Sequence, residues 1–175
     1  GQTLNTNVHW IAQQMDAIGF RVREHISISD AKKHIVSTLE NALQNADVVL
    51  ITGGLGPTND DLTMPVLNEY FGGELVIDND VYGDIEQLIT NRGFEMNENN
   101  KRQALVPNNC KVIRNAKGTA PGLWFEKDNK VVVAMPGVPY EMKGMINTIT
   151  PWLKEKYVLP EIVHQMVLTK GLPES

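Results

Sequence analysis

The chain has 175 residues, 42% of them hydrophobic and 21% charged, which is typical of one globular domain and excludes a disordered chain. Its formal net charge of -5 lacks the basic excess that binding to a phosphate backbone requires, so we expect no nucleic-acid partner. The single cysteine, Cys110, excludes an internal disulfide and favours a cytoplasmic setting, and the longest apolar runs are too short to predict a membrane partner.

The first thirty residues predict one helix and one strand. Apolar residues recur every three to four positions over residues 6–18, which predicts an amphipathic helix that begins after Asn5 or Thr6 and ends at Gly19. Apolar and polar residues then alternate over residues 20–28, which predicts a strand near the edge of a sheet.

The next segment predicts a helix, a strand and a second helix. Asp30 is a candidate cap for a helix over residues 31–46, whose apolar positions form one stripe. The apolar run of residues 47–52 predicts a strand buried on both faces of a parallel sheet. A further helix is expected over residues 63–71, where it meets the two glycines at 72–73.

The second half of the chain predicts a hairpin between two helices. Residues 81–91 have helical spacing and stop before a glycine. Residues 123–135 predict two strands joined by a turn at Asp128 and Asn129, so that residues 124–126 face residues 131–135. Helical spacing resumes over residues 140–156.

This alternation of strands and helices predicts a mainly parallel sheet with right-handed crossovers. We expect one domain over residues 1–160, followed by a terminal strand and an exit toward a further domain over residues 161–175. In such sheets ligands bind beyond the carboxyl ends of the strands, which is where the loops at residues 52–62 and 136–139 are expected.

The loop "TGGLGPTNDDLT", residues 52–63, is rich in glycine and negative charge. Each glycine costs about 0.5 to 1 kcal/mol of conformational free energy relative to alanine, so three in one loop suggest that something approaches the backbone closely. Backbone amides at the start of a helix suit a phosphate group. The pattern alone leaves a phosphate-binding loop and a plain structural turn equally open, and it matches neither the Walker A nor the Rossmann spacing.

Two adjacent aspartates, Asp60 and Asp61, close this loop. Because proline is tolerated only in the first turn of a helix, Pro65 places the helix start near residues 61–63. With Thr63 as the cap, both aspartates are left in the loop. We expect one carboxylate to hold the loop by accepting from backbone amides, and the other to face a ligand and bind Mg²⁺ or a similar cation. The alternative is that both only cap the helix.

Two further turns contain glycine and proline, "NAKGTAPG" at residues 115–122 and "MPGVPYEMKGM" at residues 135–145. Lys117 and Lys143 flank them and could neutralise phosphate, although solvated lysines are the commoner case. Glu141 lies in a first helical turn, where it favours the helix dipole. The four histidines show no metal-ligand spacing.

Three motifs in this order, "TGGLGPTNDDLT", "KRQALVPNNCKVIRNAKGTAPGL" and "MPGVPYEMKGM", resemble the N-terminal domain of the competence/damage-inducible CinA proteins, which is related to the molybdopterin-binding MoaB and MogA proteins. The resemblance implies a three-layer α/β/α sandwich around a mostly parallel sheet. It also implies a first strand and an acidic loop before Gly1, and these are not among the 175 residues.

The resemblance also implies chemistry at a phosphoanhydride. CinA N-terminal domains are associated with ADP-ribose pyrophosphatase activity, which needs a divalent metal, here Mg²⁺, Mn²⁺ or Co²⁺. We therefore expect a hydrolase with Asp60 and Asp61 as catalytic residues and Asp60 as the metal ligand. By the same resemblance, the phosphate or nucleotide is expected to contact Gly53, Gly54, Gly56, Thr58, Gly118, Thr119, Gly137 and Pro139.

Two other functions stay open. The chain could bind or adenylylate molybdopterin, as MoaB and MogA relatives do, or it could be a non-catalytic structural or regulatory domain of a longer CinA-like protein. For the hydrolase and for the molybdopterin-binding domain, the expected partner is a nucleotide or a pterin phosphate. The family resemblance also implies a homo-oligomer, either a dimer or a trimer.

Overall fold

The structure, a computed structural model, describes residues 6–159. The strand and the domain exit expected over residues 161–175, and the expected cap at Asn5, lie outside this range. The elements are α1 (Thr6–Ala17), α2 (Lys32–Asn45), β1 (Val48–Thr52), α3 (Thr63–Phe71), β2 (Leu75–Ile77), α4 (Asn79–Asn91), α5 (Glu98–Arg102), β3 (Leu105–Pro107), β4 (Lys111–Ile113), β5 (Gly122–Lys127), β6 (Lys130–Met135) and α6 (Pro139–Lys156).

The main sheet has the strand order β1-β6-β5-β4. Strand β1 runs parallel to β6, whereas β6 pairs with β5 and β5 with β4 in antiparallel register. Among the described strands the sheet is therefore mixed, with one parallel pair, where the sequence pattern predicted a mainly parallel sheet. The separate pair β2-β3 is antiparallel.

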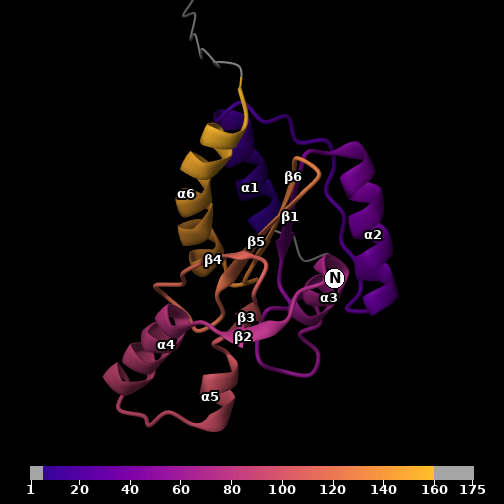
Figure 1. The fold of residues 1–175 in the computed structure, drawn as a ribbon. Helices are drawn as coiled ribbons and strands as arrows, with labels where there is room; N and C mark the ends of the chain where they lie inside the picture. The colour runs from indigo at the N-terminus through magenta and orange to yellow at the C-terminus, as the bar shows by residue number, and fades with distance from the viewer. Residues whose placement is uncertain (1–5, 160–175) are drawn as a thin grey trace, which may run out of the picture.

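Helices cover both faces of this sheet, as Figure 1 shows, with α1 and α6 on one side and α2 on the other. The alternation along β6 divides the core, because successive side chains of a strand point to opposite faces. Val131, Val133 and Met135 pack in the cluster with α1 and α6, whereas Val132 and Ala134 pack in the cluster with α2 and α3. The expected α/β class, a sheet between layers of helices, is confirmed.

The hairpin β5-β6, which the sequence predicted, forms the centre of the sheet. Asp128 and Asn129 have φ values of 51° and 61°, the left-handed conformation that a two-residue hairpin turn requires and that these residue types tolerate. The register places Trp124 opposite Val133. Phe125 is fully buried on the other face and stacks on Phe71 of α3 at 4.4 Å between ring centroids.

A smaller unit, β2, β3, α4 and α5, extends from one end of the main sheet, at the bottom of Figure 1. Val81 and Ile85 of α4 pack with Ala104 in a core cluster of their own. Of this unit the sequence predicted only α4, because strands of three residues and a helix of five are too short to show a period. Strand β2 also lacks the alternation of a half-buried strand, since all three of its residues are exposed.

The strand expected over residues 20–28 is wrong, because the structure shows no regular secondary structure in this segment. No backbone hydrogen bond is found for residues 21–28 within the described chain. Strand β1 lies at the edge of the sheet with its side chains half-buried, rather than buried on both faces as predicted. Both differences go with one feature: a groove of about 550 Å³ separates the segment from β1, and neither has a strand partner on that side among residues 6–159.

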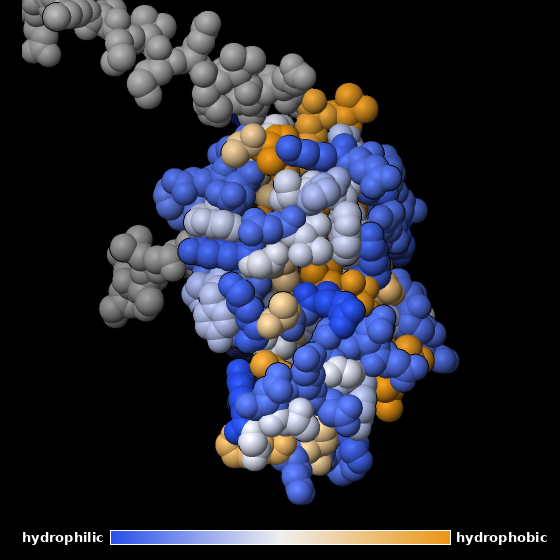
Figure 2. Space-filling view, turned by 90° about the vertical axis from the view of Figure 1, so that its left-hand side faces the viewer, coloured by the Kyte–Doolittle hydropathy of each residue, from blue (hydrophilic) through white to orange (hydrophobic). Residues whose placement is uncertain are grey.

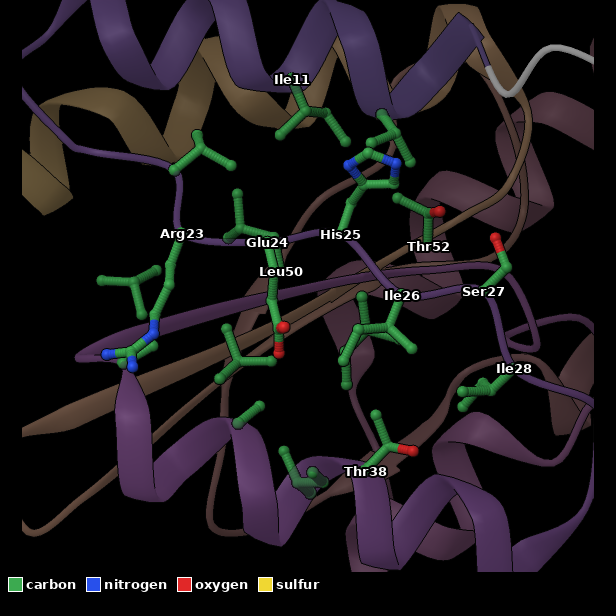
Figure 3. Close-up of a pocket in the computed structure, with 18 of the residues that line it drawn as sticks. Ile11, Arg23, Glu24, His25, Ile26, Ser27, Ile28, Thr38, Leu50 and Thr52 are labelled. Carbon is green, nitrogen blue, oxygen red and sulfur yellow. The ribbon is translucent and has the colours of Figure 1, made fainter.

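This groove lies between α1 and α2, and Figure 3 shows the side chains of Leu50 and Ile26 within it. Its wall is mainly apolar, and Ile26 is 48% exposed.

The cap of α2 differs from the predicted one. Ala31 rather than Asp30 precedes the helix and adopts an extended conformation, so α2 begins without a side-chain cap.

No described helix has the length and apolar character needed to span a membrane. The face drawn in Figure 2 is mainly hydrophilic, with apolar side chains in small separate patches. Surfaces of this kind are ordinary for a folded domain.

Tyr157, which follows α6, contacts the residues directly before β1 and β6, at the end of the sheet opposite the loops that follow these strands. Its hydroxyl donates to the carbonyls of Asp47 and Asn129, both at 3.1 Å, and burial together with the charges of Asp47 and Glu126 raises its pKa to about 12. In the unfolded chain the tyrosine pKa is about 10. The contribution of Tyr157 to the free energy of unfolding is therefore complete below pH 10 and is lost as the pH rises toward 12. We expect Tyr157→Phe to flatten the fall of the free energy of unfolding over this range, measured by urea denaturation.

Candidate functional site

The loops that follow β1 and β6 meet at one edge of the sheet, because parallel neighbours end on the same side. The Gly53 amide donates to the Met135 carbonyl at 2.8 Å. A Cβ placed on Gly137 would lie 3.5 Å from the Gly53 Cα. The side-chain amide of Asn7, in the first turn of α1, donates to the Gly137 carbonyl at 2.8 Å. Three segments far apart in the sequence thus share this edge.

Gly53 and Gly54 have φ values of 97° and 71°, a region that glycine occupies without strain. The Gly54 carbonyl accepts from the amides of Thr63 at 3.0 Å and Met64 at 3.4 Å, and a Cβ on Gly54 would overlap the Thr63 side chain. Close packing on α3 therefore accounts for Gly54. At Gly53, in contrast, no atom of the described residues other than its chain neighbours lies within 4 Å of the position a Cβ would take, so the backbone there borders open space.

The start of α3 confirms that both aspartates lie in the loop before the helix. The helix begins at Thr63, and Pro65 falls in its first turn. The prediction that Thr63 caps the helix is wrong by one residue. Leu62 takes that position, and the helix has no side-chain cap because leucine has no acceptor atom; the Thr63 amide bonds to the Gly54 carbonyl instead.

Asp61 holds the loop closed. Its Oδ2 accepts from the Thr58 amide at 3.0 Å and from the Thr58 hydroxyl at 2.6 Å. A Cβ on Gly56 would lie 2.6 Å from the same carboxylate oxygen. Gly56 and Thr58, both predicted ligand contacts, therefore shape the loop around Asp61.

Asp60 is exposed, and none of the hydrogen bonds or ion pairs found among residues 6–159 involves its side chain. We expected one aspartate to hold the loop and the other to face a ligand, and Asp61 is the one whose hydrogen bonds hold the loop. Within the same residues no three His, Cys, Asp or Glu side chains gather as a metal site. Mg²⁺ is commonly held by one or two carboxylates plus substrate phosphates and water, so a lone Asp60 fits a cation that binds together with its ligand.

The first turn of α6 offers unpaired donors beside the glycine loop. Within the described chain the amides of Gly137, Val138 and Tyr140 donate no hydrogen bond, Pro139 has no amide hydrogen, and no side chain caps the helix. Amides at a helix start carry partial positive charge, which favours an anion. The amides of α3 differ, because those of Thr63 and Met64 already donate to Gly54.

The loop at residues 115–121 joins this edge through α6. Asn115 is buried and donates to Glu141 Oε2 at 2.7 Å. Gly118 lies directly against the Glu141 carboxylate. The contacts found for Gly118 thus connect it to α6 rather than to the glycine loop.

The two lysines considered for phosphate binding differ in their surroundings. The Lys143 ammonium lies 5.2 Å from the centre of the Trp10 ring, on the α1 side of α6. Lys117 is exposed, and its backbone amide donates to the Asn115 side chain at 3.1 Å. Neither lysine supplies a positive charge that is fixed beside Asp60.

The family model described as "Probable molybdopterin binding domain" matches residues 1–155. The chain belongs to this molybdopterin-binding-domain family. Over its whole length it is 48% identical to a CinA-like protein of Flavobacterium psychrophilum and 43% identical to a CinA-like protein of Cytophaga hutchinsonii. It spans 42% of the length of each of these relatives.

Solved structures of related proteins agree with this membership. The CinA protein of Thermoplasma acidophilum, described as having unknown function, is 32% identical, with a TM-score of 0.75 and 89% of each chain covered. The tungsten-cofactor-synthesizing MoaB of Pyrococcus furiosus has a TM-score of 0.56 over 89% of this chain and 84% of its own, at 19% identity. The second likeness shows the molybdopterin-binding-domain fold alone.

Sequence reasoning missed the contacts of Asn7 and Asn115. The partner of Asn7 lies 130 positions away along the chain, so no local pattern could reveal it. Glu141 was interpreted only through the helix dipole, although its side chain is buried against another loop. A carboxylate in an otherwise apolar helix face was the available signal, because Glu141 is followed by the buried Met142 and Met145.

Proposed function

We propose that this domain binds a phosphorylated pterin of the molybdopterin type, with the phosphate at the start of α6. The observation that carries the proposal is the group of unpaired amides of Gly137, Val138 and Tyr140 beside the open space at Gly53. Several amides converging on one point bind phosphate through hydrogen bonds and through the helix dipole, without a fixed basic side chain. The family to which the chain belongs supports a pterin as the remainder of the ligand.

The test is calorimetric titration of the chain with molybdopterin and, separately, with ADP-ribose, each in the presence of Mg²⁺. We expect molybdopterin to bind at least tenfold more tightly, which corresponds to about 1.4 kcal/mol. Gly137→Pro, which removes one of the unpaired amides, should weaken the binding. The absence of measurable binding to both compounds would contradict the proposal and favour a structural or regulatory role.

Asp60 favours a second candidate, the metal-dependent hydrolysis of the pyrophosphate in ADP-ribose or a related dinucleotide. Its carboxylate is exposed, has no hydrogen bond or ion pair among residues 6–159, and lies on the loop that begins at Gly53. A bound Mg²⁺, Mn²⁺ or Co²⁺ would supply Lewis acidity at the phosphate. Water would add to one phosphorus atom as the bridging P–O bond breaks, a proton would pass to solvent, and the amides of α6 would stabilise the developing charge. Release of AMP from ADP-ribose, measured with each metal, tests this candidate.

A further inference from the structure

Glu141 is a nearly buried carboxylate in the first turn of α6. It is 8% exposed, and its Oε2 accepts a hydrogen bond from the Asn115 amide at 2.7 Å. None of the ion pairs found among residues 6–159 includes it. Withdrawing a carboxylate from water is costly unless it is well paired, and interaction with the helix dipole needs no burial. The helix start alone therefore does not account for its position.

The carboxylate of Glu141 lies against Gly118. A Cβ built on Gly118 would fall 2.6 Å from Glu141 Oε1 and would overlap the rest of the carboxylate. Gly118 has no positive φ, so backbone conformation does not require glycine there. The space for a side chain at position 118 is occupied by Glu141.

Asn115 extends this contact to both ends of the loop. Its side-chain amide donates to the Ala120 carbonyl at 2.8 Å as well as to Glu141, and its Oδ1 accepts from the Lys117 amide at 3.1 Å. One side chain thus bonds the loop before and after Gly118, and Glu141 attaches that side chain to α6. The loop is fixed to the helix whose first amides are unpaired.

We propose that Glu141 is a positioning residue for the ligand site, which holds residues 115–121 against the first turn of α6, beside the amides proposed to bind the phosphate. This inference rests on the proposed function, because it assigns Glu141 to the same site. Glu141 acts through Asn115 and the backbone at Gly118, and it contacts no reacting atom. Gly118 is therefore needed because the Glu141 carboxylate occupies the space that a larger residue at position 118 would need.

A double-mutant cycle tests the proposal, with Mg²⁺ and inorganic pyrophosphate as the probe in calorimetric titration. We expect Gly118→Ala and Glu141→Ala each to weaken binding at least tenfold. The double variant should bind no more weakly than Glu141→Ala, because the space that the alanine at 118 needs has been freed. Glu141→Gln keeps an oxygen acceptor for Asn115 and should stay within threefold of the parent chain. Independent losses that multiply to a hundredfold would overturn the proposal.

The control variant is Glu155→Gln, an exposed acid on the same helix, which should leave binding unchanged. Amide chemical shifts of Gly118 and Thr119, recorded without ligand, separate the two proposals. Large shift changes in Glu141→Ala and small ones in Glu141→Gln are expected even if the parent chain binds no pyrophosphate. Lack of pyrophosphate binding by the parent chain would count against the phosphate position proposed at the start of α6, whereas unmoved shifts in Glu141→Ala would count against the positioning role.

Discussion

If the domain hydrolyses ADP-ribose, the second function proposed above, Asp60→Asn is expected to lower this metal-dependent turnover at least tenfold, or about 1.4 kcal/mol of activation free energy. The substitution keeps the size of the side chain but removes the negative charge that would attract a divalent cation. Because Asp60 is exposed and makes no hydrogen bond or ion pair among residues 6–159, its loss should leave the loop unchanged. Initial rates over a range of Mg²⁺ concentrations measure the effect, which should be largest at low Mg²⁺.

Two further variants separate the charge of Asp60 from the shape of the loop. Asp128→Asn removes an exposed acid at the distant β5-β6 turn and should leave turnover unchanged. Asp61→Asn weakens the bonds to Thr58, so it should speed hydrogen exchange at the Thr58 amide as well as lower turnover. Full activity of the Asp60→Asn chain at every Mg²⁺ concentration would exclude Asp60 as a metal ligand.

Gly54→Ala is expected to destabilise the fold by at least about 2 kcal/mol, which is a fall of roughly 4 to 8 °C in Tm for a domain of this size. Two effects add. A φ of 71° is strained for alanine, and the new Cβ would overlap the Thr63 side chain and lie 3.0 Å from the Thr63 Cβ. Because the Gly54 carbonyl accepts from the first amides of α3, the glycine loop should shift as well. Thermal unfolding followed by circular dichroism measures the loss.

Gly83→Ala provides the matched control for this substitution. Gly83 lies inside α4, has no positive φ and has no atom within 4 Å of a Cβ position. Alanine is favoured over glycine in a helix by up to about 1 kcal/mol, so this variant should be as stable as the parent chain or more so. Equal Tm values for Gly54→Ala and the parent chain would show that the loop adapts and that Gly54 is not needed there.

The elements that the sequence predicted well are those with a full local period. Helices α2, α3, α4 and α6 each bury one stripe, and the turn at Asp128 and Asn129 has its own residue chemistry. The segment at residues 20–28 has the alternation of a strand, but it pairs with no strand among residues 6–159. Alternation reports which residues are apolar, whereas a ladder also needs a partner at the right distance, which a single segment cannot reveal.

The candidate site was predictable in outline only. Glycine-rich turns after strands are visible in sequence, and Pro65 correctly placed Asp60 and Asp61 in the loop. Which aspartate holds the loop depends on the direction of one side chain toward Thr58, and the role of Glu141 depends on a loop 26 positions away. Both are consequences of tertiary packing, so the residue pattern could name the participants but not divide the roles between them.

The free edge of β1 has a consequence for how the chain behaves at high concentration. Strand β1 has five residues without charge, proline or bulge, the features with which natural edge strands prevent pairing with other molecules. A groove with apolar walls lies beside it, so a strand from another molecule could add to the sheet there. Among the described residues, the edge of β1 therefore combines an unprotected strand with apolar surroundings, which favours association between molecules at high concentration.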